Sequence, residues 1–147
     1  MNTPVTMHFS IEEMYASDTA KRLGINNTPS TQQMINLVYL CAYVLEPLRV
    51  AMGKPIKISS GFRCQELTKA VGGVYNSQHL KGQAADIDIQ GDMAFGKKIF
   101  EYIRDHLPFD QLIWEHTKSG TYWVHVSFVY PDFGKNRKNV INNLEKK

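Results

Sequence analysis

The sequence has little of several features that mark specialised classes of protein. Its 147 residues contain only two cysteines, too few for a disulfide framework or a cysteine-based zinc cluster. No run approaches the roughly 18 uninterrupted apolar residues of a membrane-spanning helix, and the N-terminus lacks the basic segment and long apolar stretch of a secretory signal. We therefore expect no membrane span. We also expect synthesis in the cytoplasm without a signal peptide, with retention there or release to the cell wall by another protein.

A strong charge of either sign is also missing. The net charge is +3, and no stripe of Arg and Lys of the kind that binds nucleic acid is present. No internal repeat, low-complexity tract or interdomain linker interrupts the chain. Hydrophobic residues make up 43% and charged residues 21% of the sequence, as in folded proteins. These features predict one monomeric domain over residues 1–147 that binds no nucleic acid.

Two helical patterns dominate the first third of the chain. Ser10 and Glu13 form a capping box, which predicts a short helix from Ser10 to about Gly24. The second pattern predicts a long amphipathic helix, capped by Ser30 with Gln33, kinked by Pro47 and ended by Gly53. Its apolar face consists of Met34, Leu37, Val38, Cys41, Val44, Leu45 and Leu48.

Strand patterns follow the long helix. Alternating residues predict strands at 56–59, 84–89, 111–115 and 122–128, the last two forming an antiparallel hairpin, with helices at 65–71 and 93–106. Helices outside and short strands between them favour an α+β fold in which a small antiparallel sheet carries helices on one face. We expect the core to span about 9–128, and the Lys- and Asn-rich tail at 134–147 to be loosely held.

Polar residues inside apolar strands are the main functional signal. Asp86 and His125 lie in two such strands, and His79 lies on a turn leading into the first. A buried carboxylate is costly without a partner, and a metal cation is one such partner. The alternative for each histidine is an ordinary core residue. Two His and one Asp with an open fourth position suit catalytic zinc, whereas Cys41 and Cys64 are expected to be structural.

Three segments together resemble a known family. They are Ser77-x-His79-x-x-Gly82-x-Ala84-x-Asp86, Trp123-Val124-His125-Val126-Ser127 and Ile58-Ser59-Ser60-Gly61-Phe62-Arg63. The pattern is similar to the zinc D-Ala-D-Ala peptidases, which include D,D-carboxypeptidases, vancomycin-resistance D,D-dipeptidases and phage L-alanyl-D-glutamate endolysins. Their fold is shared with the Hedgehog signalling domain. The resemblance covers about residues 9–128, and short single-domain members found in phages, prophages and bacteria match it best.

The resemblance implies roles for individual residues. His79, Asp86 and His125 match the zinc ligands. Arg63 matches the arginine that stabilises the oxyanion of the substrate carbonyl and so also binds substrate; the alternative is a surface salt bridge. Ser77 matches a serine that bonds the substrate or supports the site.

The catalytic base departs from the family pattern. Many members have a Glu three residues before the second zinc-binding His, where this chain has Tyr122. The nearest carboxylate is Glu115, and His116 is the second candidate. If Glu115 paired with Tyr122, it would lie on the face opposite His125. It reaches the zinc face only if it pairs with Trp123 or if a bulge intervenes.

The sequence thus predicts a zinc-dependent metallopeptidase that hydrolyses peptidoglycan stem peptides. A D-Ala-D-Ala carboxypeptidase and a cell-wall endopeptidase would share all these residues, so the bond cut stays open, as does phage or host origin. The alternatives are a non-catalytic, zinc-containing binding module of the same fold and a metal-free structural component of a phage.

Overall fold

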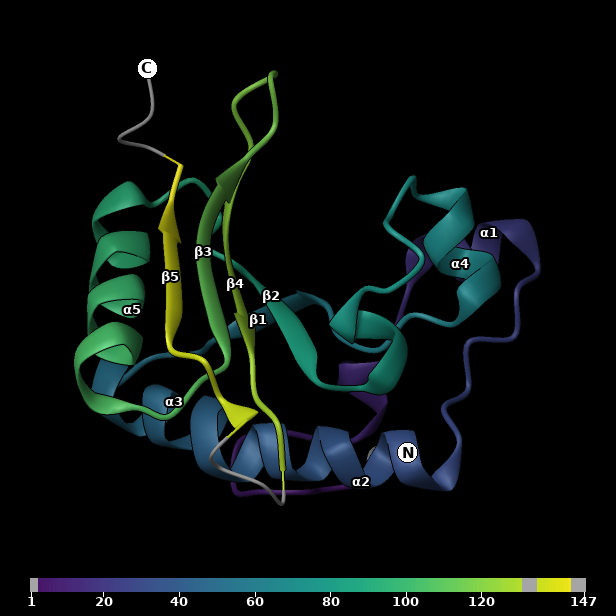
Figure 1. Ribbon diagram of the computed structural model, residues 1–147, viewed down its shortest axis with the longest axis horizontal. Coiled ribbons are helices and arrows are strands. Elements are labelled where there is room, and N and C mark those ends of the chain that lie inside the picture. The colour runs from purple at the N-terminus through teal and green to yellow at the C-terminus, as the bar shows by residue number, and fades with distance from the viewer. Residues whose placement is uncertain (1–2, 131–134, 144–147) are drawn as a thin grey trace.

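The computed structural model describes residues 3–130 and 135–143, and its centre is a five-stranded sheet (Figure 1). The strand order is β1-β2-β4-β3-β5. These strands are β1 Lys57–Ser60, β2 Ala84–Asp88, β4 Tyr122–Ser127, β3 Gln111–His116 and β5 Asn139–Asn142. All neighbours are antiparallel except β3 and β5, which are parallel. The predicted α+β class is confirmed, with one parallel edge strand added.

The long helix predicted from the periodic pattern forms in three consecutive parts. These are α2 (Thr31–Leu40), the π-helical η2 (Cys41–Leu45) and α3 (Glu46–Met52). Ser30 and Gln33 form the predicted capping box, and Gly53 ends the helix at φ 70°. In η2 the Glu46 N–H bonds to the Cys41 carbonyl, five residues back. This wide turn precedes Pro47 and accommodates its missing N–H.

The same helix, Thr31–Met52, is long and apolar enough to cross a membrane by length and composition. Core helices and signal sequences meet these two criteria as well, so they are weak evidence of a membrane span. In the structure the helix supplies much of the core. Its fully buried side chains are Leu37, Leu40, Cys41, Val44, Leu45 and Leu48.

The two faces of the sheet differ in character. Leu112 and Trp114 of β3 and Val124 and Val126 of β4 are buried in the core. Helix α5 (Met93–His106), predicted at those residues, packs against these strands at Gly96, where an added Cβ would lie 2.1 Å from the Trp114 ring. The residues of β3 and β4 that alternate with these buried ones face the other side of the sheet. That face is therefore available for polar groups.

The N-terminal helix prediction is wrong in its extent. The Ser10 N–H donates to Glu13 Oε1 at 2.7 Å and the Glu13 N–H to Ser10 Oγ at 3.3 Å, but this box encloses only the 3₁₀ turn η1 (Glu12–Met14). A separate helix, α1 (Asp18–Leu23), begins after Ser17. The Met14 carbonyl accepts the Phe62 N–H at 2.7 Å, so it bonds the loop after β1 instead of continuing a helix.

The prediction of a loosely held tail is also wrong for the described part of 134–147. Residues 139–142 form β5, which pairs with the edge of β3. Lys138 Nζ donates to the Leu107 carbonyl at 2.8 Å. The edge of β3 offers unpaired backbone groups, and pairing with β5 satisfies them. Residues 134 and 144–147 lie outside the described residues.

Candidate metal centre and active site

His79 is positioned by a short 3₁₀ helix, η3 (Gln78–Lys81), which precedes β2. Ser77 caps this helix, since its Oγ accepts the His79 N–H at 3.2 Å. The ring Nδ1 of His79 lies 2.6 Å from the Gly61 carbonyl oxygen, which can only accept a hydrogen bond. Nδ1 therefore donates to Gly61, and Nε2 is the ring nitrogen that faces Asp86 and that a metal ion would bind.

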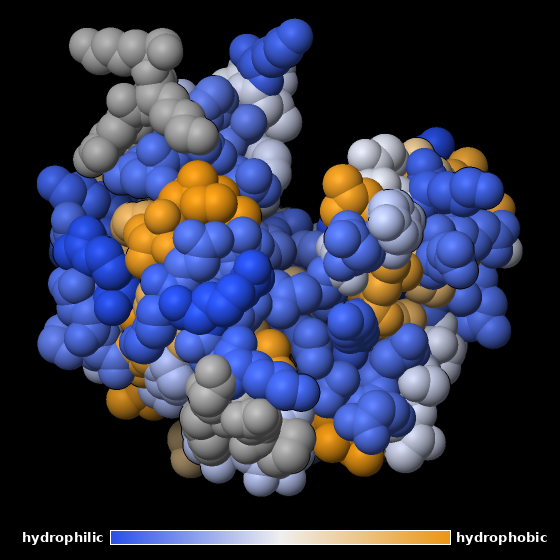
Figure 2. All heavy atoms as spheres, in the orientation of Figure 1, coloured by the Kyte–Doolittle hydropathy of each residue, from blue (hydrophilic) through white to orange (hydrophobic). Residues whose placement is uncertain are grey.

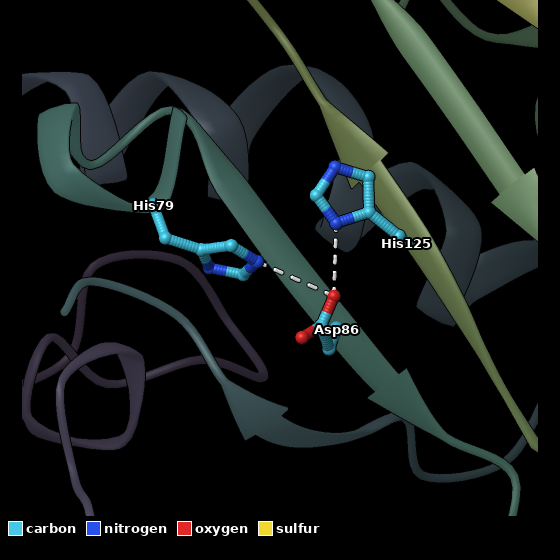
Figure 3. Close-up of side chains that lie close together, drawn as sticks. All are labelled: His79, Asp86 and His125. Atoms are coloured by element: carbon cyan, nitrogen blue, oxygen red, sulfur yellow. Dashed lines mark hydrogen bonds and ion pairs between the residues drawn. The ribbon is translucent and has the colours of Figure 1, made fainter. Parts of the chain in front are cut away.

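Asp86 and His125 come together through strand pairing. Asp86 of β2 lies directly opposite His125 of β4. His125 Nδ1 is 2.9 Å from Asp86 Oδ1, and His79 Nε2 is 3.4 Å from the same oxygen. Figure 3 shows both imidazole rings pointing at the carboxylate, one from η3 and one from β4.

The electrostatics of this cluster favour an ionised carboxylate. Burial raises the pKa of Asp86, but His79 and His125 outweigh that effect and hold the pKa below its usual range. The three side chains are only 3%, 14% and 11% exposed for His79, Asp86 and His125. A buried anion held between two imidazoles is the environment in which a divalent cation gains most from its ligands.

The donor set fits zinc. The three donor atoms lie within 4.8 Å of one another, and they comprise two imidazole nitrogens and one carboxylate oxygen. The cluster opens into a groove with a cavity volume of about 610 Å³. Figure 2 shows this side of the molecule hollowed between the β3–β4 hairpin and the lobe of α1 and α4 (Gln65–Ala70). One side of the cluster is thus accessible, as a catalytic site requires. This groove is called the site groove below.

Arg63 also lines the site groove. Its backbone N–H bonds the His79 carbonyl at 3.1 Å, which ties it to the metal-binding segment. Its Nε is buried and has no hydrogen-bond partner among the described residues. Burial lowers the pKa of Arg63, and nearby Asp86 partly offsets this. A half-buried guanidinium that lines the groove and forms no salt bridge within the described residues does not fit the alternative of a surface salt bridge.

Glu115 lies on the same face as the metal cluster. The hairpin register pairs Glu115 with Trp123 and Ile113 with His125, and all four residues line the site groove. Pairing with Trp123 is one of the two conditions under which Glu115 was expected to reach the zinc face. His116 instead pairs with Tyr122, so it belongs to the opposite face, where it is exposed and its ring packs against Tyr122.

Two further observations bear on the predicted site. Ser77 lines the groove, although its hydroxyl already supports His79. Arg137 also lines the groove and is ion-paired with Asp110 at 2.8 Å. Sequence reasoning missed Arg137 because it sits in a Lys- and Asn-rich segment with no periodic pattern. The buried Asp110 beside a predicted strand was the signal that could have pointed to a partner there.

The two cysteines have the structural roles that the sequence predicts. Cys41 is buried in the core, and this burial raises the pKa of its thiol to about 12. Cys64 caps α4, its Sγ lying 3.5 Å from the Leu67 nitrogen. Neither cysteine lines the site groove.

Comparison with known proteins agrees with this geometry. Residues 7–127 match the family described as peptidase M15. A 44-residue segment is 48% identical to the zinc D-Ala-D-Ala carboxypeptidase of Streptomyces albus G. That segment is 29% of this chain and 17% of the relative, so the match spans only a small part of that protein. Since the family match covers most of the sequence, the chain belongs to the peptidase M15 family.

Proposed function

We propose that this protein is a zinc-dependent peptidase that hydrolyses a bond in peptidoglycan stem peptides. The observation that carries the proposal is the convergence of His79, Asp86 and His125, with Glu115 on the same face of the sheet. A zinc ion bound by these three residues would polarise the scissile carbonyl and activate a water molecule. The name of the carboxypeptidase matched above supports both zinc and a D-Ala-D-Ala-like substrate.

The protein's own residues supply the remaining chemistry. Glu115 accepts the proton of the attacking water and delivers it to the leaving amine. Arg63 donates hydrogen bonds to the carbonyl oxygen as it gains negative charge, which is commonly the largest catalytic contribution. Its place on the wall of the site groove and its half-buried position suit this role, because a donor partly shielded from water interacts more strongly with a developing charge. Ser77 holds His79 in place and contacts the substrate at the groove wall.

The products of hydrolysis identify the peptide bond that is cut. Zinc-loaded protein is incubated with purified muropeptides, and the products are analysed by mass spectrometry. Loss of one alanine would identify a carboxypeptidase, whereas two peptide fragments would identify an endopeptidase.

The role of Glu115 is tested by Glu115→Gln, with His116→Ala as the matched control on the neighbouring residue. Glu115→Gln should retain zinc and the folded state but lose nearly all hydrolysis, since the amide cannot accept the proton. His116→Ala should stay active because His116 is exposed on the opposite face. The reverse result would assign the base to His116.

The same assay separates the alternatives. Zinc binding without turnover of any muropeptide would indicate a binding module of the same fold. Purified protein with no affinity for zinc would favour a structural component and overturn the proposal.

A further inference from the structure

The site groove contains a second cation that the mechanism does not use. Arg137 lines the groove but lies outside residues 7–127, which match the peptidase M15 family. It precedes β5, which is the edge strand beside β3. Residues beyond the family match therefore contribute directly to the wall of the groove.

Arg137 is held firmly in place. Its Nε and Nη2 donate to the two carboxylate oxygens of Asp110 at 3.0 and 2.8 Å, and its backbone N–H donates to Asp110 Oδ1 at 2.9 Å. Gln78, next to the metal ligand His79, donates to Asp110 Oδ2 at 2.9 Å. The buried Asp110 therefore fixes Arg137 relative to the metal-binding segment.

The guanidinium retains binding capacity despite this pair. A guanidinium has about five N–H donors, and Asp110 engages only Nε and Nη2. The Arg137 side chain is 61% exposed, in contrast to 3% for Asp110. The remaining N–H groups thus lie at an accessible surface of the groove, already oriented by the buried carboxylate. Such a fixed planar donor is well suited to a second carboxylate.

The groove is electrostatically asymmetric along β3. Glu115 lies near the hairpin end, and Arg137 is tied to Asp110 at the opposite end, next to Gln111. The four-residue separation of Gln111 and Glu115 corresponds to about 14 Å of strand. Ile113, paired with the metal-binding His125, lies between them. An extended peptide of about four residues would therefore reach from Glu115 across the metal cluster to Arg137.

We propose that Arg137 is a specificity residue that binds one carboxylate of an acidic peptide substrate, at the end of the groove away from Glu115. This inference rests on the proposed peptidase function and adds a substrate feature to it. The competing explanation is that Arg137 only anchors β5 through Asp110. An anchor would affect all substrates equally, whereas a specificity residue would act only on substrates with the matching carboxylate.

The test uses the muropeptide that zinc-loaded protein cleaves, with each carboxyl group converted in turn to a carboxamide. For the wild-type protein, one conversion should lower kcat/KM by about tenfold or more, as expected for loss of a charge-assisted hydrogen bond. In Arg137→Gln, that conversion should have no further effect, while the other conversions act as before. An equal loss on every substrate would overturn the proposal.

Control variants separate specificity from folding. Arg104→Gln removes an arginine of α5 that also pairs with an aspartate, Asp105, but lies outside the site groove. Arg104→Gln should keep the wild-type preference, which is the higher kcat/KM for the carboxylate form of the muropeptide than for its carboxamide. Arg137→Lys keeps the positive charge and should retain part of that preference. If Arg137→Gln does not fold, a weaker preference for the acid over the amide in Arg137→Lys than in the wild type supports the proposal, and full retention of the wild-type preference overturns it.

A binding measurement distinguishes failure of this inference from failure of the proposed function. Titration calorimetry compares the acid and amide muropeptides on zinc-loaded Glu115→Gln protein, with and without Arg137→Gln. If wild-type protein cleaves nothing but binds the acid more tightly through Arg137, the peptidase proposal fails and the carboxylate site stands. If it cleaves acid and amide peptides equally well, the carboxylate site fails and the peptidase proposal stands.

Discussion

At the scale of single residues, the side chains of each β-strand alternate between the apolar core and the face that carries the candidate active site. Val124 and Val126 are fully buried in the core, while His125 between them faces the groove. Asp86 and Glu115 occupy the same face on the neighbouring strands. Each polar side chain therefore reaches the site without passing through the apolar core. The rigid sheet then fixes their separations.

Replacing Arg63 with alanine should affect turnover more than substrate binding. The guanidinium interacts with a charge that exists fully only in the transition state, so we expect kcat to fall by about 100-fold or more with a small change in KM. Steady-state kinetics on the cleaved muropeptide measure both constants. Arg22→Ala, on the exposed surface of α1, is the control and should change neither. A rise in KM alone would show that Arg63 binds the ground state instead.

Replacing His125 with alanine should abolish tight zinc binding. Ligand binding to the folded state adds about 2.7 kcal/mol of stability at a metal concentration 100 times Kd, so the variant should also melt at a lower temperature. EDTA should lower the Tm of the wild-type protein but not that of His125→Ala. His106→Ala, at the exposed end of α5, should bind zinc as the wild type does. Unchanged zinc content in His125→Ala would contradict the assignment.

The metal-binding residues could be predicted from sequence because their types and spacing carry the information. A histidine before a glycine turn and an aspartate inside an apolar strand can both be recognised in the amino-acid sequence without a structure. The place of Glu115 could not be predicted, since it depends on the register of the β3–β4 hairpin. A shift of one residue in that register would have put Glu115 on the opposite face.

At the scale of elements, Gly82 determines how the metal-binding turn meets the long helix. Gly82 ends η3 at φ 72°, and a Cβ there would lie 2.4 Å from the Gln33 carbonyl oxygen of α2. The side chain of Gln33 also donates to the Leu80 carbonyl at 3.1 Å. The turn that carries His79 is therefore packed directly on α2, which explains why glycine is required there.

Gly82→Ala should destabilise the protein and weaken zinc binding. Gly24→Ala is a matched control, because Gly24 has a similar φ of 69° but an added Cβ would meet nothing within 4 Å. The left-handed conformation alone should cost about 1–2 kcal/mol in both variants. Gly82→Ala should lose more, because the clash with Gln33 displaces η3. Chemical denaturation and zinc titration measure the two effects, and equal losses would contradict the close packing.

The secondary structure was predicted well where local signals agree with tertiary contacts. Helix α5 has the predicted bounds, and the capping box of α2 begins that helix as expected. The N-terminal helix was overextended because a distant backbone group, the Phe62 N–H, takes up the Met14 carbonyl. Strand β5 was missed because its short segment gains its conformation from the edge of β3, which the local sequence does not reveal.

At the scale of the whole molecule, Asp110 connects three distant parts of the chain. Its carboxylate accepts hydrogen bonds from Gln78 before β2 and from Arg137 before β5, while its own backbone N–H bonds the Ser127 carbonyl of β4. Its backbone carbonyl accepts the Asn139 N–H at the start of β5. A single buried side chain thus joins the added edge strand to the metal-binding segment.

This role predicts a pH-dependent loss of stability in Asp110→Asn. Hydrogen bonds from Arg137 hold the pKa of Asp110 below its usual value. A lowered pKa in the folded state stabilises the protein above the unfolded value of about 3.9, and this contribution is lost as the pH falls through the folded pKa.

At pH 7 we expect Asp110→Asn to be less stable by about 2 kcal/mol, as for hydrogen bonds to a charged group. The difference should shrink as the pH falls below the unfolded value toward the folded pKa, because wild-type Asp110 then becomes neutral too. Urea denaturation across this pH range measures it, with Asp105→Asn, an exposed carboxylate paired with Arg104, as a control that should show little change. A difference that stays constant with pH would mean that the Asp110 carboxylate does not contribute through its charge.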